Sequence, residues 1–110
     1  MDKITRTNGT VTIIELSGRF DAYSAPSVAA WFDSVSEQGK IVVNLSGVNF
    51  IDSTALATLV QGMKRCRQHN GDMHLTELRQ PVRVIMELTR LDKAFSIYAN
   101  ESEAVNSFAS

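Results

Sequence analysis

The sequence predicts an α/β domain with a mixed, mainly parallel sheet, a hairpin at its N-terminus and about four helices. Short stretches rich in β-branched residues alternate with longer segments whose apolar residues recur every three or four positions. This pattern is typical of strands that alternate with helices, and such strands pair in parallel through right-handed crossovers. A length of 110 residues fits one domain, which we expect to span residues 1–110.

The N-terminal part of the chain, from Thr5 to Ser17, predicts a β-hairpin. Asn8-Gly9 suits a tight turn with positive φ and lies between two strand-like stretches. The segment from Gly18 to Asp21 breaks this pattern, so the second strand is expected to end before it. The hairpin adds an antiparallel edge to the sheet.

A helix and a buried strand come next. Ser24 can cap the helix, and Pro26 is tolerated in its first turn. The apolar stripe of this helix consists of Val28, Trp31, Phe32 and Val35. The run Ile41–Leu45 is short, apolar and rich in β-branched residues, which predicts a strand buried on both faces. Ser46-Gly47 is expected to turn the chain before a second extended piece at Val48–Ile51.

The second half of the chain continues the alternation. A helix follows Asp52-Ser53 and ends at Asn70-Gly71, and a strand is expected at Met73–Thr76. The inward residues of that helix are Leu56, Leu59, Val60 and Met63. Gln80-Pro81 opens a third helix. Its inward residues are Val82, Ile85, Met86 and Leu88. After a brief strand at Phe95–Tyr98, the last helix is capped near Asn100 or Ser102 and turns Ala104, Val105 and Phe108 to one side.

Composition and charge exclude several classes of function. The net charge is −1, and Lys64, Arg65 and Arg67 complement the negative end of a helix, so we expect no nucleic-acid binding. No apolar run approaches the roughly 18 residues that a membrane helix needs, so we expect no direct membrane insertion. The N-terminus does not resemble a secretory signal. A single cysteine, Cys66, is typical of a reducing compartment, and we therefore expect a cytoplasmic protein.

Catalysis, metal binding and cofactor binding are not expected. The chain has no glycine-rich phosphate loop, no G-x-S-x-G and no H-E-x-x-H motif. Cys66, His69 and His74 are the candidate soft metal ligands, but their spacing matches no metal site. A nucleophilic Ser53 would need a base. His69 lies fifteen residues past Thr54 on the same helix, roughly 22 Å away, and His74 could approach only by an unusual fold-back.

The segment from Asn49 to Leu56 is the most informative part of the sequence. An apolar strand ends there, an acid and two hydroxyl residues follow, and a helix begins. On physical grounds alone, Asp52 or Ser53 is the N-cap of that helix. The alternative is that a hydroxyl at this helix start has a function of its own, because the unpaired N–H groups there favour an anion.

Two segments resemble motifs of STAS domains, in particular of the bacterial anti-sigma factor antagonists. FIDSTAL, from Phe50 to Leu56, is similar to the family's D-S-[S/T]-G-L segment, and GRFDAYSAP, from Gly18 to Pro26, is similar to G-x-[LIF]-D-x-x-[ST]-A. The resemblance extends over nearly the whole chain. One departure is Ala55, where the family usually has Gly, and its methyl group is expected close to the docking surface.

The resemblance implies that Ser53, the first hydroxyl after the acid, is a regulatory phosphorylation site, with Thr54 beside it. The implied partners are a serine-kinase anti-sigma factor, with an ATPase fold like that of histidine kinases, and a manganese-dependent serine phosphatase. In that family the unphosphorylated antagonist binds the kinase and frees the sigma factor. The resemblance therefore implies a partner-switching, protein-binding module that regulates transcription and is not an enzyme.

The expected partner-binding surface combines the start of the second helix, its polar side and the loop before the first helix. It consists of Asp21, Tyr23, Ser24, Asp52, Ser53, Thr54, Ala57, Thr58 and Gln61. Asp21 and Asp52 match acidic residues near the family's site, and Tyr23 is either a partner anchor or a lid on the core. An alternative function for the same fold is a STAS subunit of a lipid-transport or other membrane-transport assembly, without a phosphorylation switch.

Overall fold

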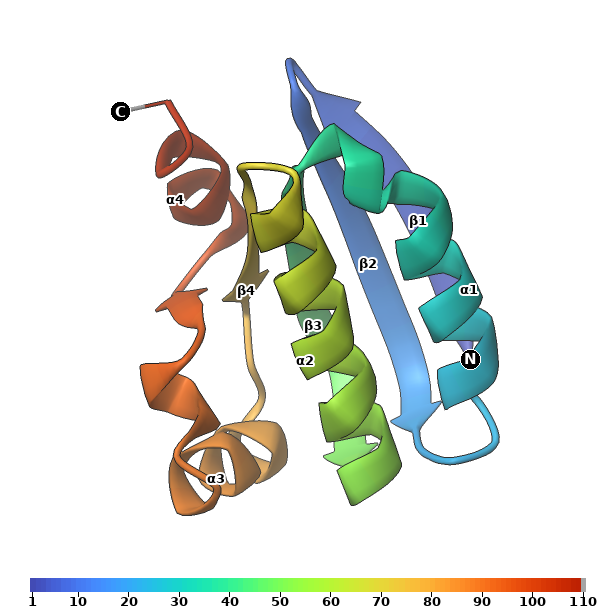
Figure 1. Cartoon of the computed structure of the whole chain (residues 1–110). Coiled ribbons are helices and arrows are strands. Elements are labelled where there is room, and N and C mark those ends of the chain that lie inside the picture. The colour runs from blue at the N-terminus through green and yellow to red at the C-terminus, as the bar shows by residue number, and fades with distance from the viewer. Residues whose placement is uncertain (110) are drawn as a thin grey trace.

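A computed structural model describes residues 1–109, which form one five-stranded sheet with helices on both faces (Figure 1). The strands are β1 (Asp2–Asn8), β2 (Val11–Phe20), β3 (Lys40–Ile51), β4 (Asp72–Thr76) and β5 (Ser96–Tyr98). The helices are α1 (Ala25–Val35), α2 (Ser53–Gln68), α3 (Gln80–Leu88) and α4 (Glu101–Asn106). Two short 3-10 helices, η1 (Ser36–Gln38) and η2 (Leu91–Lys93), follow α1 and α3.

The order of the strands in the sheet is the order of the strands in the chain, β1-β2-β3-β4-β5. β1 pairs with β2 in antiparallel register, from Asp2 opposite Ser17 to Asn8 opposite Val11. All the following neighbours are parallel. The predicted mixed, mainly parallel sheet with an N-terminal hairpin and four helices is therefore confirmed.

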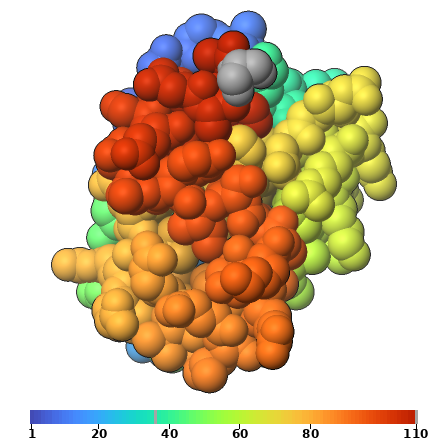
Figure 2. All heavy atoms as spheres, turned by 90° about the vertical axis from the view of Figure 1, so that its left-hand side faces the viewer, coloured from blue at the N-terminus to red at the C-terminus, as the bar shows by residue number. Residues whose placement is uncertain are grey.

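The sheet separates two hydrophobic cores. The larger core packs under α1, α2 and α3, and includes Leu16, Phe32, Leu59 and Met86. The smaller core lies on the opposite face, where Ala104 of α4 covers Val11, Ile13 and Val42. Ile41–Leu45 is buried throughout, as predicted for a strand covered on both sides. Figure 2 shows the C-terminal segment in red above α3 in orange, close to the blue tip of the β1–β2 hairpin.

Two predicted breaks in the strands are wrong. β2 continues through Gly18 to Phe20, and β3 continues through Ser46-Gly47 to Ile51. The glycines serve an irregular strand pairing, because the β2–β3 register shifts between Glu15 and Ser17 and again after Gly18. A Cβ atom on Gly47 would lie 2.5 Å from the Cβ of Ser17, so the strands approach too closely there for any side chain.

The helix boundaries follow the sequence closely, but one inward residue is misplaced. The spacing predicts that Leu88 of α3 faces the hydrophobic core. The side chain is instead 76% exposed, because α3 ends at that residue. Trp31 is only partly buried, and its indole N–H donates to Thr5 Oγ1 at 3.1 Å. None of the helices within residues 1–109 combines the length and the apolar character that a bilayer crossing requires.

Candidate functional site

The candidate site lies at the edge of the sheet where β2 and β3 end. The loop after β2 and the start of α2 lie side by side at the lower end of the molecule in Figure 1. The amide of Asp52 donates to the carbonyl of Phe20 at 3.2 Å, which joins the two strand ends. Since the carboxyl ends of parallel strands share one edge of the sheet, the two family-like segments meet here.

The carboxylate of Asp52 fixes the start of α2. Its Oδ1 accepts a hydrogen bond from the amide of Ala55 at 2.9 Å, which makes Asp52 the N-cap. Its Oδ2 accepts a second hydrogen bond from the amide of Ala22, also at 2.9 Å. One side chain therefore caps the helix and holds the loop that precedes α1.

That loop is organised by two further side chains. Asp21 Oδ1 accepts from the amides of Tyr23 and Ser24 at 3.0 and 3.2 Å. Ser24 Oγ accepts from the amide of Asp21 and donates to the carbonyl of Arg19, at 3.0 and 2.9 Å. The backbone hydrogen bond from Ser24, with that from Tyr23 and the nearby Arg19, holds the pKa of Asp21 below its usual range. Asp21 is therefore a stable anion that shapes the loop.

Ser53 and Thr54 are exposed at the first two positions of α2. Within the described residues, the Ser53 hydroxyl makes no hydrogen bond, so it is available to another molecule. Tyr23 is 97% exposed at the tip of the neighbouring loop, so it is not a lid on the core, and its role as a partner anchor stays a prediction. A serine hydroxyl, a threonine hydroxyl and an aromatic ring thus share one accessible surface.

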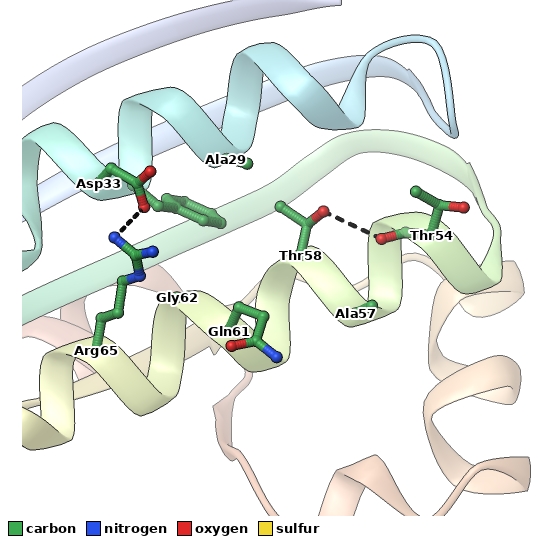
Figure 3. A pocket seen from close by; sticks show the side chains of 9 residues that line it. Ala29, Asp33, Thr54, Ala57, Thr58, Gln61, Gly62 and Arg65 are labelled. Atoms are coloured by element: carbon green, nitrogen blue, oxygen red, sulfur yellow. Dashed lines mark hydrogen bonds and ion pairs between the residues drawn. The ribbon is translucent and has the colours of Figure 1, made fainter.

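A groove between α1 and α2 extends this surface (Figure 3). It has a volume of about 430 Å³ and begins at Thr54, one residue from Ser53. Ala57, Thr58 and Gln61, which belong to the predicted partner-binding surface, line the α2 side. The Thr58 hydroxyl donates to the Thr54 carbonyl at 3.0 Å, so it presents its methyl group to the groove.

The predicted surface residues fall into two groups in the structure. Those on the accessible surface are Tyr23, Ser53, Thr54, Ala57 and Gln61. Those whose side chains are partly buried and held by internal hydrogen bonds are Asp21, Ser24, Asp52 and Thr58. The second group shapes the surface that the first group offers.

Sequence reasoning missed the α1 side of this surface. Ala29, Phe32 and Asp33 of α1 line the groove, and Arg65 forms an ion pair with Asp33 at 2.6 Å across it. The available signal is two small residues, Ala29 on α1 and Gly62 on α2. A Cβ atom on Gly62 would lie 2.8 Å from the ring of Phe32 and 2.7 Å from Met73, so this glycine lets Phe32 of α1 pack closely against α2. Which sides of the two helices face each other depends on how both pack on the sheet.

The expectation that the methyl group of Ala55 lies at the docking surface is wrong. Ala55 is 0% exposed and belongs to the larger hydrophobic core. It is the third residue of α2, and the helix turns its side chain toward the sheet while Ser53 and Thr54 face outward. The substitution of the usual Gly therefore adds core packing and leaves the surface unchanged.

The three candidate metal ligands, Cys66, His69 and His74, lie within α2, at its C-cap and on β4. His74 is 7% exposed, stacks on the ring of Phe108 at 4.0 Å and hydrogen-bonds Ser107 Oγ through Nδ1 at 2.7 Å. Burial raises the pKa of Cys66 to about 11, which keeps its thiol protonated. His69 is the C-cap of α2, at the far end from Ser53. Over residues 1–109, no three His, Cys, Asp or Glu side chains gather in a group that could hold a metal ion.

Comparisons with known proteins agree with this geometry. The family model of the STAS domain matches residues 2–104. The anti-sigma F factor antagonist of Paenibacillus polymyxa is 29% identical over 98 residues, which cover 86% of this chain and 84% of that protein. The anti-sigma-B factor antagonist of Listeria monocytogenes is 30% identical over 92 residues, which cover 82% and 81%.

A solved structure gives the same result in three dimensions. The crystal structure of a candidate anti-sigma factor antagonist from Thermotoga maritima superposes with a TM-score of 0.90 at 27% identity, covering 96% of this chain and 92% of that one. The match therefore extends over nearly the whole of both chains. The chain belongs to the STAS domain family, and its relatives include the bacterial anti-sigma factor antagonists.

Proposed function

We propose that this chain is an anti-sigma factor antagonist whose binding is switched by phosphorylation of Ser53. In its unphosphorylated form it binds a serine-kinase anti-sigma factor and thereby releases the factor's target. The observation that carries this proposal is the exposed Ser53 hydroxyl at the first position of the 16-residue helix α2. The names of its relatives, which are antagonists of anti-sigma factors, support the choice of partner.

The position of Ser53 supports a switch that acts through charge. The start of a helix has unpaired N–H groups and a positive potential, so it can accommodate an anion. A phosphate adds roughly −1.5 to −2 charges at neutral pH. In an interface packed over Ser53, that charge would be buried without a partner, at a cost on the order of several kcal/mol. Because about 1.4 kcal/mol is tenfold in affinity, phosphorylation is sufficient to dissociate the complex.

The proposal assigns a role to each partner. The anti-sigma factor, with its histidine-kinase-like ATPase fold, is both the binding partner and the enzyme that phosphorylates Ser53. A manganese-dependent serine phosphatase removes the phosphate and restores binding. Thr54 is a secondary acceptor because it is exposed beside Ser53. The chain itself acts as a cytoplasmic binding module and catalyses no reaction.

The modification is tested with the purified chain, ATP and each serine kinase encoded near its gene. We expect mass spectrometry to locate the phosphate on Ser53, and we expect Ser53→Ala to lose most of the modification and to keep only the minor fraction carried by Thr54. Thr54→Ala is the matched control, and we expect it to be phosphorylated as the wild type. Failure of every such kinase to modify Ser53 contradicts the proposal.

The binding switch is tested by titrating that kinase with Ser53→Asp, which we expect to bind at least tenfold more weakly than the wild type. Ser102→Asp is the control, because Ser102 is an exposed serine in the first turn of α4 and lies far from the site. Equal affinity of Ser53→Asp and wild type contradicts a mechanism based on charge. Co-purification with a membrane ATPase in place of a soluble kinase would favour the alternative role in a transport assembly.

A further inference from the structure

The groove between α1 and α2, here called the α1–α2 groove, has an apolar floor that lies mostly outside the predicted partner-binding surface. The ring of Phe32 and the small residues Ala29, Ala57 and Gly62 form its surface. In Figure 3, Ala29 on α1 faces the hollow opposite Thr58 on α2. A volume of about 430 Å³ lies within the range of pockets that bind apolar groups.

The polar groups around this floor are largely satisfied within the chain. The Thr58 hydroxyl donates to the Thr54 carbonyl at 3.0 Å, and Arg65 pairs with Asp33 at 2.6 Å. An occupant therefore need not provide hydrogen bonds on the floor, and burying apolar side chains there has no desolvation penalty from unpaired groups. Gln61 remains on the rim as an adaptable donor and acceptor.

Beyond Arg65 the lining of the groove becomes more polar and charged. A second hollow of about 420 Å³ shares Asp33, Gln61 and Arg65 with the first and continues past Lys64 toward the end of α2, with Glu37 also in its lining. Within residues 1–109, Lys64 forms no ion pair and its side chain is exposed. The surface thus runs from a hydroxyl-bearing helix start, through an apolar trough, to a cation without a partner.

We infer that the α1–α2 groove receives an amphipathic helix of the same anti-sigma partner, whose apolar side chains fill the trough and whose acidic residue pairs with Lys64. The inference rests on the proposed function and extends its contact surface. An amphipathic helix presents apolar residues every three or four positions along one face, which suits a groove between two helices. The trough begins at Thr54, so a partner seated in it passes directly beside Ser53.

This arrangement links the docking helix to the switch. A phosphate on Ser53 would lie at the mouth of the trough, where the partner's apolar residues enter. The apolar groups would have to approach a dianion and displace its water, which opposes docking along the whole helix. The groove supplies affinity and selects the partner, and Ser53 controls access to it.

The test fills the trough from α1 and measures binding of the kinase that phosphorylates Ser53. Ala29→Leu places a larger side chain in the trough, and Ala30→Leu places the same side chain at the next, exposed position outside it. We expect Ala29→Leu to weaken binding at least tenfold and Ala30→Leu to change it less than twofold. Circular dichroism and thermal unfolding check that both variants are folded. Ala57→Leu fills the opposite wall from an exposed position and gives the same test if Ala29→Leu does not fold.

The charge of the partner is tested separately. We expect Lys64→Glu to weaken binding severalfold at low salt, with a smaller effect at high salt. Lys93→Glu makes the same charge change at an exposed position in η2 and is expected to have no effect. Equal binding of Lys64→Glu and Lys93→Glu would exclude the acidic residue in the docking helix.

Two results separate this inference from the proposed function. If Ser53→Asp blocks binding while Ala29→Leu and Ala57→Leu bind as the wild type does, the groove is not the docking site and the switch stands. If Ser53→Asp leaves binding unchanged, or no kinase modifies Ser53, the proposed function fails and this inference fails with it.

Discussion

The two oxygens of the Asp52 carboxylate accept hydrogen bonds from segments 30 residues apart, the amides of Ala55 and Ala22. At the scale of single residues, this side chain joins the two halves of the site. The loop that presents Tyr23 is therefore positioned relative to Ser53 by one carboxylate. A shape-complementary interface needs such fixed positions, because residues that must first be ordered reduce its affinity.

We expect Asp52→Ala to lower the free energy of unfolding by about 1–2 kcal/mol, because the helix loses its N-cap. We also expect the amide of Ala22 to exchange its hydrogen faster, since its acceptor is removed. Urea unfolding and hydrogen exchange measure the two effects. Asp2→Ala, on the exposed strand β1, is expected to stay within about 0.5 kcal/mol of the wild type. An unchanged exchange rate at Ala22 would contradict the joining role.

Single residues also show what the sequence could and could not reveal. The cap at Asp52 was predictable because an acid directly before an apolar helical stripe is a local signal. Its second hydrogen bond, to Ala22, was not, since it depends on two strands ending at the same edge. The burial of Ala55 and the exposure of Tyr23 likewise depend on which side of the chain faces the sheet.

At the scale of elements, α4 is held on the sheet by an ion pair at its start and a ring stack beyond its end. At its start, Glu101 accepts two hydrogen bonds from the guanidinium of Arg6, at 2.7 and 2.8 Å. This contact, with a hydrogen bond from Asn44, lowers the pKa of Glu101 despite its partial burial. Beyond its end, Phe108 stacks on His74 at 4.0 Å. A helix of only six residues depends on such contacts because it has little stability of its own.

We expect the fold to lose stability as the pH falls from 7 to 5, through His74. Burial lowers the pKa of His74 below 6.5, although Asp72 opposes the shift, so the unfolded chain binds a proton more readily than the folded one. The stabilisation is complete above the unfolded pKa and is lost as the pH falls toward the folded value. Urea unfolding at both pH values measures this change. His74→Phe should remove that part of the pH dependence, whereas His69→Phe, at the exposed end of α2, should keep it.

The elements themselves were mostly predictable from local patterns. Apolar periodicity, caps and Gln80-Pro81 located the helices, as the cap at Asn100 and the start of α3 show. The glycines in β2 and β3 were misleading, because Gly18 and Gly47 are signals of turns in a sequence but allow irregular pairing and close approach in a sheet. Only the neighbouring strand distinguishes these two uses.

For the whole molecule, we expect phosphorylation of Ser53 to leave the fold unchanged. The start of α2 can accommodate the charge, and Ser53 is exposed outside the core. Amide chemical shifts should change at residues 21–24 and 52–58 and remain constant in β5 and α4. The unmodified chain and Ser53→Ala, treated with the same kinase, are the references. Shift changes throughout the sheet would show that the switch acts by rearrangement instead of charge.

The overall architecture was predictable because alternating strands and helices permit few arrangements. The faces covered by the helices were not predictable from the alternation. α4 has few apolar residues and packs on the face opposite α1, α2 and α3 because Val11, Ile13 and Val42 leave an apolar patch there. The α1–α2 groove also arises only when both helices are placed on the sheet.

Each strand of this sheet pairs with the strand before it in the chain. During synthesis from the N-terminus, every new strand therefore meets a finished edge and need not wait for a distant segment. Tyr23, Ser53, Thr54, Ala57 and Gln61 all precede β4, so the proposed partner-binding surface is encoded in the portion of the chain that leaves the ribosome first. The final third, with α3 and α4, contributes none of these residues to the proposed surface.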